Sequence, residues 1–166
     1  MSSAVKISDF SRSVSVIASE IGVVLSEAVN STLVTSKSSS SVNFKGYVSR
    51  NSLFCIRDDA SGEIAGVVSI DDDPEVESIP CWSKELQPSA EISRLGVAEK
   101  YQNRGIAREL LAGAMEELRI RGCKSAHMLV AKDNVKALRS YAKLAFEKVG
   151  EYVLQGHDYW CFEKKL

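Results

Sequence analysis

The sequence predicts an α/β (α+β) fold in which a mixed β-sheet is covered by helices. Short runs rich in Val, Ile, Leu and Phe alternate with segments of helical periodicity, in the order strand, helices, two strands, strand, helix, strand, helix, two strands. This order contains no internal repeat. Because 166 residues are close to the usual length of one domain, we expect a single domain over residues 1–166.

Composition narrows the functional classes. Hydrophobic residues make up 45% of the chain and charged residues 26%, as in ordinary globular proteins. The formal net charge of −1 leaves no basic field to attract a nucleic acid backbone, so we expect no nucleic acid partner. Residues 1–12 lack the apolar stretch of a signal peptide, and no apolar run is long enough to span a membrane. We therefore expect a cytoplasmic protein without a membrane partner.

The cysteines do not indicate a metal site. They are widely spaced, form no C-x-x-C pair, and have only two histidines to assist them. We expect no metal, and thiols that fill core space in a reducing compartment. The four cysteines are Cys55, Cys81, Cys123 and Cys161.

The first part of the chain predicts a short strand followed by helices. Residues 4–7 fit a first strand, and the apolar residues between positions 14 and 28 approximate one helical face, as one or two helices. The Ser-rich residues 36–41 are typical of a loop. Residues 53–57 and 64–70 then predict a β-hairpin, with a turn over residues 58–63.

Residues 71–88 form a long connection that carries six acidic residues and all three prolines. So long a segment with little periodicity is either functional or disordered. Its acidic side chains would attract a cationic amine, but they fit a solvated loop equally well. Both interpretations stay open.

The strand that begins near residue 90 has an irregular alternation. Glu91 and Ser93 would share a face with Leu95 and Val97, which mixes polar and apolar side chains. We therefore expect a β-bulge near Leu95 and Gly96 that switches the faces. A bulge leaves backbone groups unpaired, and these are able to bind an extended ligand that contains amides.

A helix follows this strand from Gly105 to about Gly122. Its N-terminus would present free N–H groups and a partial positive charge to a phosphate, and Gly105 lets the backbone approach such an anion. Taken alone, Gln102-x-x-Gly105-x-Ala107 fits a simple tight turn at least as well.

The last elements are a buried strand over residues 124–131, a helix over residues 135–144, and two strands over residues 146–154 and 159–165. Asp133 or Asn134 is a natural N-cap for this helix. Asn134 and Tyr141 are two turns apart and share a helical face. Each also has a simpler explanation, as a cap alone and as a core aromatic residue.

Taken together, the residues resemble the GNAT superfamily of acetyl-coenzyme A dependent N-acetyltransferases. Residues 102–107 (QNRGIA) are similar to the family's pyrophosphate loop Q/R-x-x-G-x-G/A. Residues 134–146 are similar to its second signature, in which N-x-x-A-x-x-x-Y precedes G-F. The resemblance implies a single GNAT-like domain whose mixed, mostly antiparallel sheet of six to seven strands is flanked by helices. It also implies acetyl-coenzyme A as co-substrate.

The resemblance assigns site residues by position. The backbone of Leu95, Gly96 and Val97 would pair with the pantetheine arm. Asn134 would contact the coenzyme, and Tyr141 would lie near its sulfur as a catalytic residue. Glu91 stands where some members keep a general base, with water as the alternative base. The pyrophosphate would be held by Gln102, Asn103, Arg104, Gly105, Ile106 and Ala107.

The chain also departs from the family pattern. Ala107 replaces the usual second loop glycine, which the family tolerates, and Ala145 replaces the usual glycine before Phe146, which should mildly strain a turn. Members that acetylate protein N-termini often have a glutamate at the position of Leu129. Its absence weakens the case for that class of substrate and favours Glu91 as the base.

The implied reaction is transfer of an acetyl group to a primary amine of a small molecule or peptide, by direct attack in a ternary complex. An amine with a pKa of about 10 must lose a proton before it attacks, and a thiolate with a pKa of about 8.5 leaves more easily beside a donor. Glu91 and Tyr141 would serve these two needs. A non-catalytic coenzyme A binding module is the alternative, and a homodimer is compatible with the sequence.

Overall fold

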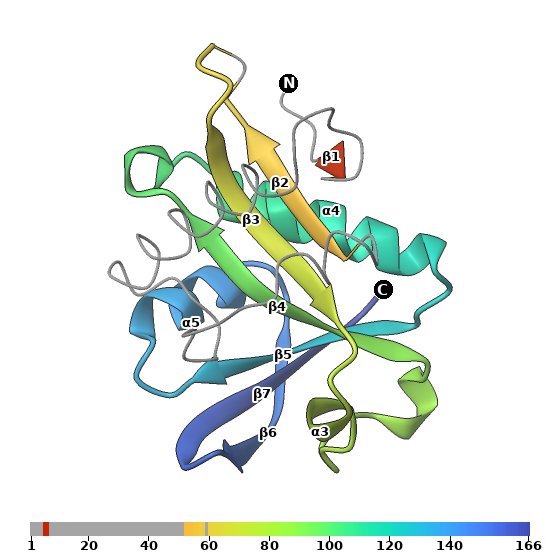
Figure 1. Cartoon of the computed structure of the whole chain (residues 1–166). Coiled ribbons are helices and arrows are strands. Elements are labelled where there is room, and N and C mark those ends of the chain that lie inside the picture. Colours follow the sequence, from red (N-terminus) through yellow and green to blue (C-terminus); the bar gives the residue numbers. More distant parts are fainter. Residues whose placement is uncertain (1–4, 7–51, 59) are drawn as a thin grey trace.

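The computed structural model describes residues 5–6, 52–58 and 60–166. The helices expected between residues 9 and 28 and the loop over residues 36–41 lie outside the described residues. Seven strands form one sheet in the order β1-β2-β3-β4-β5-β7-β6, and every neighbouring pair is antiparallel except β4 and β5 (Figure 1). The mixed, mostly antiparallel sheet flanked by helices is therefore confirmed.

Within the described residues the strands and the two longest helices follow the predicted order, and a short helix within residues 71–88 was not predicted. The strands are β1 Val5–Lys6, β2 Leu53–Arg57, β3 Ile64–Asp71, β4 Ser89–Val97, β5 Ser125–Ala131, β6 Glu147–Leu154 and β7 His157–Lys165. The helices are α3 Pro74–Glu77, α4 Ile106–Ile120 and α5 Val135–Ala142, with short 3₁₀ helices at Lys84–Leu86 and Glu99–Tyr101. The helix α5 ends two residues earlier than its periodicity predicts.

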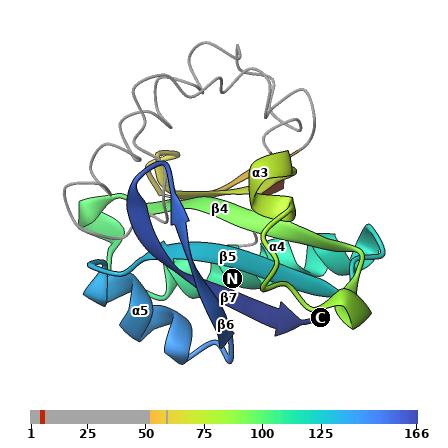
Figure 2. The same ribbon diagram turned by 90° about the horizontal axis from the view of Figure 1, so that it is seen from below.

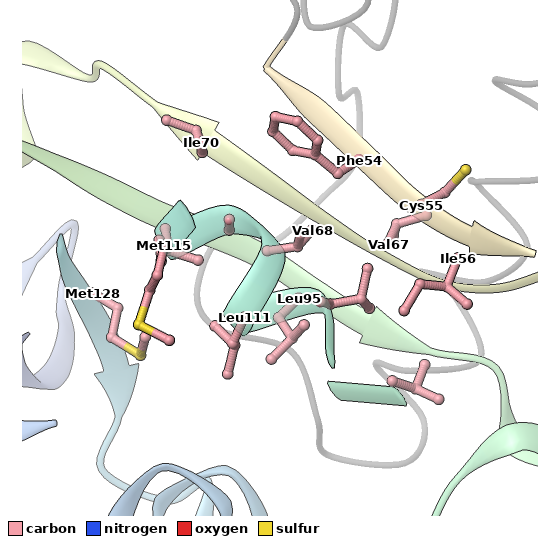
Figure 3. Packing of buried hydrophobic residues seen from close by; sticks show 14 of the residues in the cluster. Phe54, Cys55, Ile56, Val67, Val68, Ile70, Leu95, Leu111, Met115 and Met128 are labelled. Atoms are coloured by element: carbon pink, nitrogen blue, oxygen red, sulfur yellow. The ribbon is translucent and has the colours of Figure 1, made fainter. Parts of the chain in front are cut away.

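The helix α4 covers one face of the sheet. Its apolar side chains recur at helical spacing and are buried against β2, β3, β4 and β5. Leu111 and Met115 lie beside Leu95 of β4 and Met128 of β5 (Figure 3). Gly122, with φ of 83°, follows the helix, as predicted. The buried residues of α4 are Leu110, Leu111, Ala114, Met115 and Leu118.

The opposite face of the sheet is covered by residues 72–88. This segment is neither a structureless nor a fully solvated loop, because it contains α3 and a second apolar cluster with Val76, Ile79 and Trp82 at its centre. The indole nitrogen of Trp82 donates to the carbonyl of Val76 at 2.8 Å, so the ring is both packed and hydrogen-bonded. Figure 2 shows α3 and α4 on opposite sides of β4.

The expected β-bulge is present in β4. Val67 pairs with Gly96 and Ser69 with Ser93, so the single residue Val68 of β3 faces both Arg94 and Leu95 of β4. Arg94 has φ of 47°, in the left-handed region. The bulge turns the apolar side chains of Leu95 and Val97 into the core under α4.

The only parallel pair in the described sheet is short. β4 and β5 pair at three positions, Ser89 with Ser125, Ala90 with Ala126, and Glu91 with His127. Beyond Glu91 the two strands diverge, as Figure 1 shows. Among the described strands, none pairs with the edge of β4 that faces β5 at residues 95–97, although the other edge of β4 pairs with β3 there.

Candidate functional site

A pocket of about 370 Å³ lies where β4, residues 101–108 and α5 meet. It brings together eight of the predicted site residues, which come from both sequence signatures and from the end of β4. These eight are Leu95, Val97, Gln102, Asn103, Gly105, Ile106, Ala107 and Tyr141. Four predicted residues, Gly96, Arg104, Asn134 and Glu91, are not part of the pocket lining.

The N-terminus of α4 opens onto this pocket. Gly105 precedes the helix with φ of 85°, and its Cβ position has no neighbouring atom within 4 Å. The amide of Gln102 donates to the carbonyl of Val97 at 3.3 Å, which ties the loop to the end of β4. Since the first N–H groups of a helix have no partner inside it, this end of α4 offers donors and a partial positive charge.

The backbone at Gly96 is held by close packing from the other side. Gly66 of β3 lies beneath it, and a Cβ built on Gly66 would approach the Gly96 carbonyl oxygen and Leu110 Cδ1 to 2.9 Å each. Only glycine fits there without a shift of the backbone. This contact fixes the position of β4 relative to α4 at the wall of the pocket.

Tyr141 is almost completely buried and lines the pocket. Its hydroxyl has no hydrogen-bond partner among the described residues. Burial raises the pKa of the phenol well above its ordinary value, so the hydroxyl keeps its proton at neutral pH. The side chain therefore presents an unused proton donor to the pocket.

Asn134 acts as the predicted cap. Its side-chain oxygen accepts from the backbone N–H of Ala137 at 3.1 Å, and the residue is buried. The structure thus gives Asn134 a local role in starting α5, the helix that carries Tyr141.

Three basic residues of the pocket were not predicted from the sequence: Arg108 on α4, and Arg139 and Lys143 on α5 or at its end. Their positive charges would attract an anion to the pocket, onto which the N-terminus of α4 also opens. The only sequence signal was the spacing of Arg139 and Lys143, which are four residues apart and so neighbours on a helix. Basic residues on a solvated helix give the same signal.

Glu91 lies apart from this pocket, on the face of β4 that α4 does not cover. It is buried, and its partners in the register are Asp71 on β3 and His127 on β5. Asp71 itself pairs with Arg94, Nη1 to Oδ2 at 2.6 Å. Glu91 therefore stands at the last position where β4 and β5 are joined.

Arg104 contacts the ring of Tyr101, with 5.5 Å between the guanidinium carbon and the ring centre. In the described part of the chain, no cluster of three or more His, Cys, Asp or Glu side chains is arranged to hold a metal ion. No helix among the same residues is long and apolar enough to cross a membrane.

The pocket fits an elongated anionic ligand that contains amides. It combines helix N–H donors, three basic side chains, a strand edge and a buried phenol, and the last two have no partner in the described part of the chain. These features suit, in turn, the pyrophosphate, the pantetheine amides and the sulfur end of acetyl-coenzyme A.

Comparisons with known proteins agree with this geometry. The model of the acetyltransferase (GNAT) family matches residues 27–146. An acetyltransferase of Pectobacterium atrosepticum is 33% identical over 70 residues, which cover 39% of this chain and 50% of that protein. The chain thus matches about half the length of the curated relatives, or somewhat less.

Solved structures share the fold. A protein of Acinetobacter baylyi ADP1 assigned as an acetyltransferase has a TM-score of 0.71 at 14% identity, with 100% of this chain and 93% of that chain covered. The yncA protein of Salmonella typhimurium, solved with its cofactor acetyl-CoA, has a TM-score of 0.68 at 14% identity, with 100% and 94% covered.

Proposed function

The chain belongs to the GNAT acetyltransferase family, and from this premise we propose that it transfers the acetyl group of acetyl-coenzyme A to a primary amine. The acceptor would be a small molecule or a peptide that attacks directly in a ternary complex. We treat residues 1–166 as one N-acetyltransferase-like domain. The observation that carries the proposal is the pocket that joins the N-terminus of α4 to the buried hydroxyl of Tyr141.

In this proposal the chain holds the coenzyme by its phosphates and amides. Residues 102–107 surround the pyrophosphate, and Arg108, Arg139 and Lys143 offset its negative charge. At the edge of β4 that faces β5, the backbone of residues 95–97 donates hydrogen bonds to the pantetheine arm and accepts hydrogen bonds from it. When bound, acetyl-coenzyme A supplies an activated thioester and a thiolate leaving group.

Tyr141 donates a proton or a hydrogen bond to the departing sulfur. Its raised pKa keeps the phenol protonated at neutral pH, which suits a donor and excludes a role as base. Because the hydroxyl has no partner among the described residues, no internal hydrogen bond has to break before it acts.

Glu91 takes the proton from the incoming ammonium. Its burial supports this role, because carboxylates are rarely buried and those with a catalytic function often are. The acceptor would then approach from the face of β4 opposite α4, where residues 72–88 contribute acidic side chains.

The test uses two glycines at the two ends of α4. Gly105 and Gly122 have nearly equal φ of 85° and 83°, and the Cβ position of each is free of neighbours within 4 Å. Glu at either position carries a similar backbone strain, but only Gly105→Glu places a negative charge beside the proposed phosphate site. We expect calorimetry to show acetyl-coenzyme A affinity reduced at least about tenfold in Gly105→Glu and unchanged in Gly122→Glu.

Unchanged affinity in a folded Gly105→Glu variant would remove the proposed coenzyme site. An acetyl-coenzyme A consumption assay with a panel of amines and peptides then separates an enzyme from a binding module. Binding without turnover across the panel would favour the non-catalytic alternative.

A further inference from the structure

A row of four buried ionisable residues crosses the sheet on the face opposite α4. The register pairs Asp71 with Glu91, Glu91 with His127, and His127 with Glu163, on β3, β4, β5 and β7. Cross-strand partners project from the same face, so these side chains are neighbours. Each is less than 10% exposed, and His127 is fully buried. So many ionisable groups in a buried row call for a physical reason.

The two ends of this row have strong donors of their own. Asp71 Oδ2 accepts from Arg94 Nη1 at 2.6 Å. Glu163 Oε2 accepts from the backbone N–H and the hydroxyl of Ser83, at 3.0 and 2.6 Å, and its Oε1 accepts from Ser125 at 2.8 Å. Glu91 and His127 lie between these two ends and form the central pair of the row.

His127 connects this pair to the surface. Its ring stacks on Trp82 with 4.4 Å between the ring centres, and its Nε2 lies 3.1 Å from Oε1 of Glu77 on α3. The Glu77 side chain is 29% exposed and therefore reaches water. Neither ring nitrogen makes a hydrogen bond to a described residue, so Nε2 and Glu77 Oε1 are close without the alignment of a hydrogen bond. The charged groups that face the ring are thus Glu91 from β4, Glu163 from β7 and Glu77 from α3.

We propose that His127 passes the proton that Glu91 takes from the acceptor amine to Glu77 and so to solvent. This inference rests on the proposed function, because it begins with a proton on Glu91. The proton leaves the ammonium nitrogen, is held on the Glu91 carboxylate and moves to an imidazole nitrogen of His127. A proton leaves the ring from Nε2 to Glu77, which releases it to water. Each group then has its original charge, and a flip of the imidazole ring, which now carries its proton on the other nitrogen, restores the starting arrangement before the next turnover.

The physical need for such a relay follows from burial. Glu91 is 3% exposed, so a proton on its carboxylate has little direct contact with bulk water. Imidazole is the side chain best suited to the transfer, because it accepts a proton at one nitrogen and gives one up at the other near neutral pH. In this role His127 is a positioning residue for turnover rather than one that touches the substrate.

The first test observes the ring of His127 directly and needs no acceptor. The chain has only two histidines, and His157 is exposed, so it serves as an internal reference. We expect Glu91→Gln and Glu77→Gln each to move the ring ¹⁵N chemical shifts of His127 and to leave those of His157 unchanged. Glu75→Gln, which removes an exposed carboxylate from the same helix, should move neither. An unchanged His127 signal in Glu91→Gln would overturn the relay.

The second test measures turnover with an accepted amine. We expect kcat to fall about tenfold or more in His127→Gln and His127→Ala, with unchanged affinity for acetyl-coenzyme A. Free imidazole should restore part of kcat in His127→Ala and have no effect on the wild type, a result that a purely structural role would not give. Glu77→Gln should also lower kcat, whereas Glu75→Gln should not. If the His127 variants fail to fold, the comparison of Glu77→Gln with Glu75→Gln tests the relay instead.

The outcomes separate the two proposals. Turnover in the wild type with unchanged kcat in the His127 and Glu77 variants would overturn the relay alone. Absence of turnover with every amine, despite acetyl-coenzyme A binding, would overturn the proposed function and the relay with it.

Discussion

Replacement of Tyr141 by Phe removes one oxygen atom from the pocket and keeps the ring in place. The hydroxyl is buried without a partner among the described residues, and leaving such a group unsatisfied costs about 1–3 kcal/mol. We therefore expect the variant to be more stable by about 1–2 kcal/mol, which corresponds to a rise in Tm of roughly 2–8 °C for a chain of this size. The same change removes the proposed proton donor, so kcat should fall by about tenfold or more.

The assay combines thermal unfolding, calorimetry with acetyl-coenzyme A and steady-state kinetics with an accepted amine. Coenzyme affinity should change by less than about twofold, because the ring and the rest of the pocket remain. Tyr152→Phe, on β6 and away from the pocket, is the matched control and should leave kcat unchanged. A gain in stability together with a loss of rate is the expected signature of a donor held without a partner for catalysis.

A normal rate in Tyr141→Phe would refute the reasoning about catalysis and leave Tyr141 as a core aromatic residue. A loss of stability would refute the reasoning about the hydroxyl, because it would reveal a partner that the described residues do not provide.

Two further predictions concern the backbone. Gly66→Ala should lower the free energy of unfolding by about 1–3 kcal/mol and weaken acetyl-coenzyme A binding, because its Cβ would press on the Gly96 carbonyl; Gly62→Ala, with open space around it, should leave binding unchanged. Gly62 has φ of 71°, so both variants lose some stability in urea unfolding, and the decisive comparison is calorimetry: equal acetyl-coenzyme A affinity in Gly66→Ala and Gly62→Ala would contradict the prediction. Ala145→Gly should raise the free energy of unfolding by about 0.5–1 kcal/mol, because Ala145 has φ of 56°, which glycine adopts without strain. As a control, Ala112→Gly within α4 should lower the free energy of unfolding by about 1 kcal/mol. A decrease in stability in both variants would disprove the strain at Ala145.

The sequence predicted those features of the fold and the site whose residue pattern has a single physical explanation. The mixed alternation around Glu91 and Leu95 required a switch of faces, and the bulge is found there. Gly105 and Gly122 bracket an amphipathic run, and α4 lies between them. Ala145 stands at a position of positive φ, as the departure from the family pattern led us to expect.

The parts that sequence reasoning missed have patterns with several causes. Residues 72–88 lack periodicity because Val76, Ile79 and Trp82 are buried from a short helix and turns rather than from one regular face. Arg139 and Lys143 look like any solvated basic pair until the fold places α5 beside the pocket. His127 sits in an apolar strand, and only the register of four strands reveals its acidic neighbours.

The point where β4 and β5 separate is the position about which a change in the angle between the two strands would turn. Glu91 and His127 form the last pair before the strands diverge, so a change in the angle between the strands moves them least. A rotation of about 5° there would shift a backbone atom one residue away by about 0.3 Å, but one six residues away, near Val97, by roughly 1.7 Å. A rotation of β4 relative to β5 would thus widen or narrow the gap between the strands near Val97, while the distance between Glu91 and His127 would stay nearly constant.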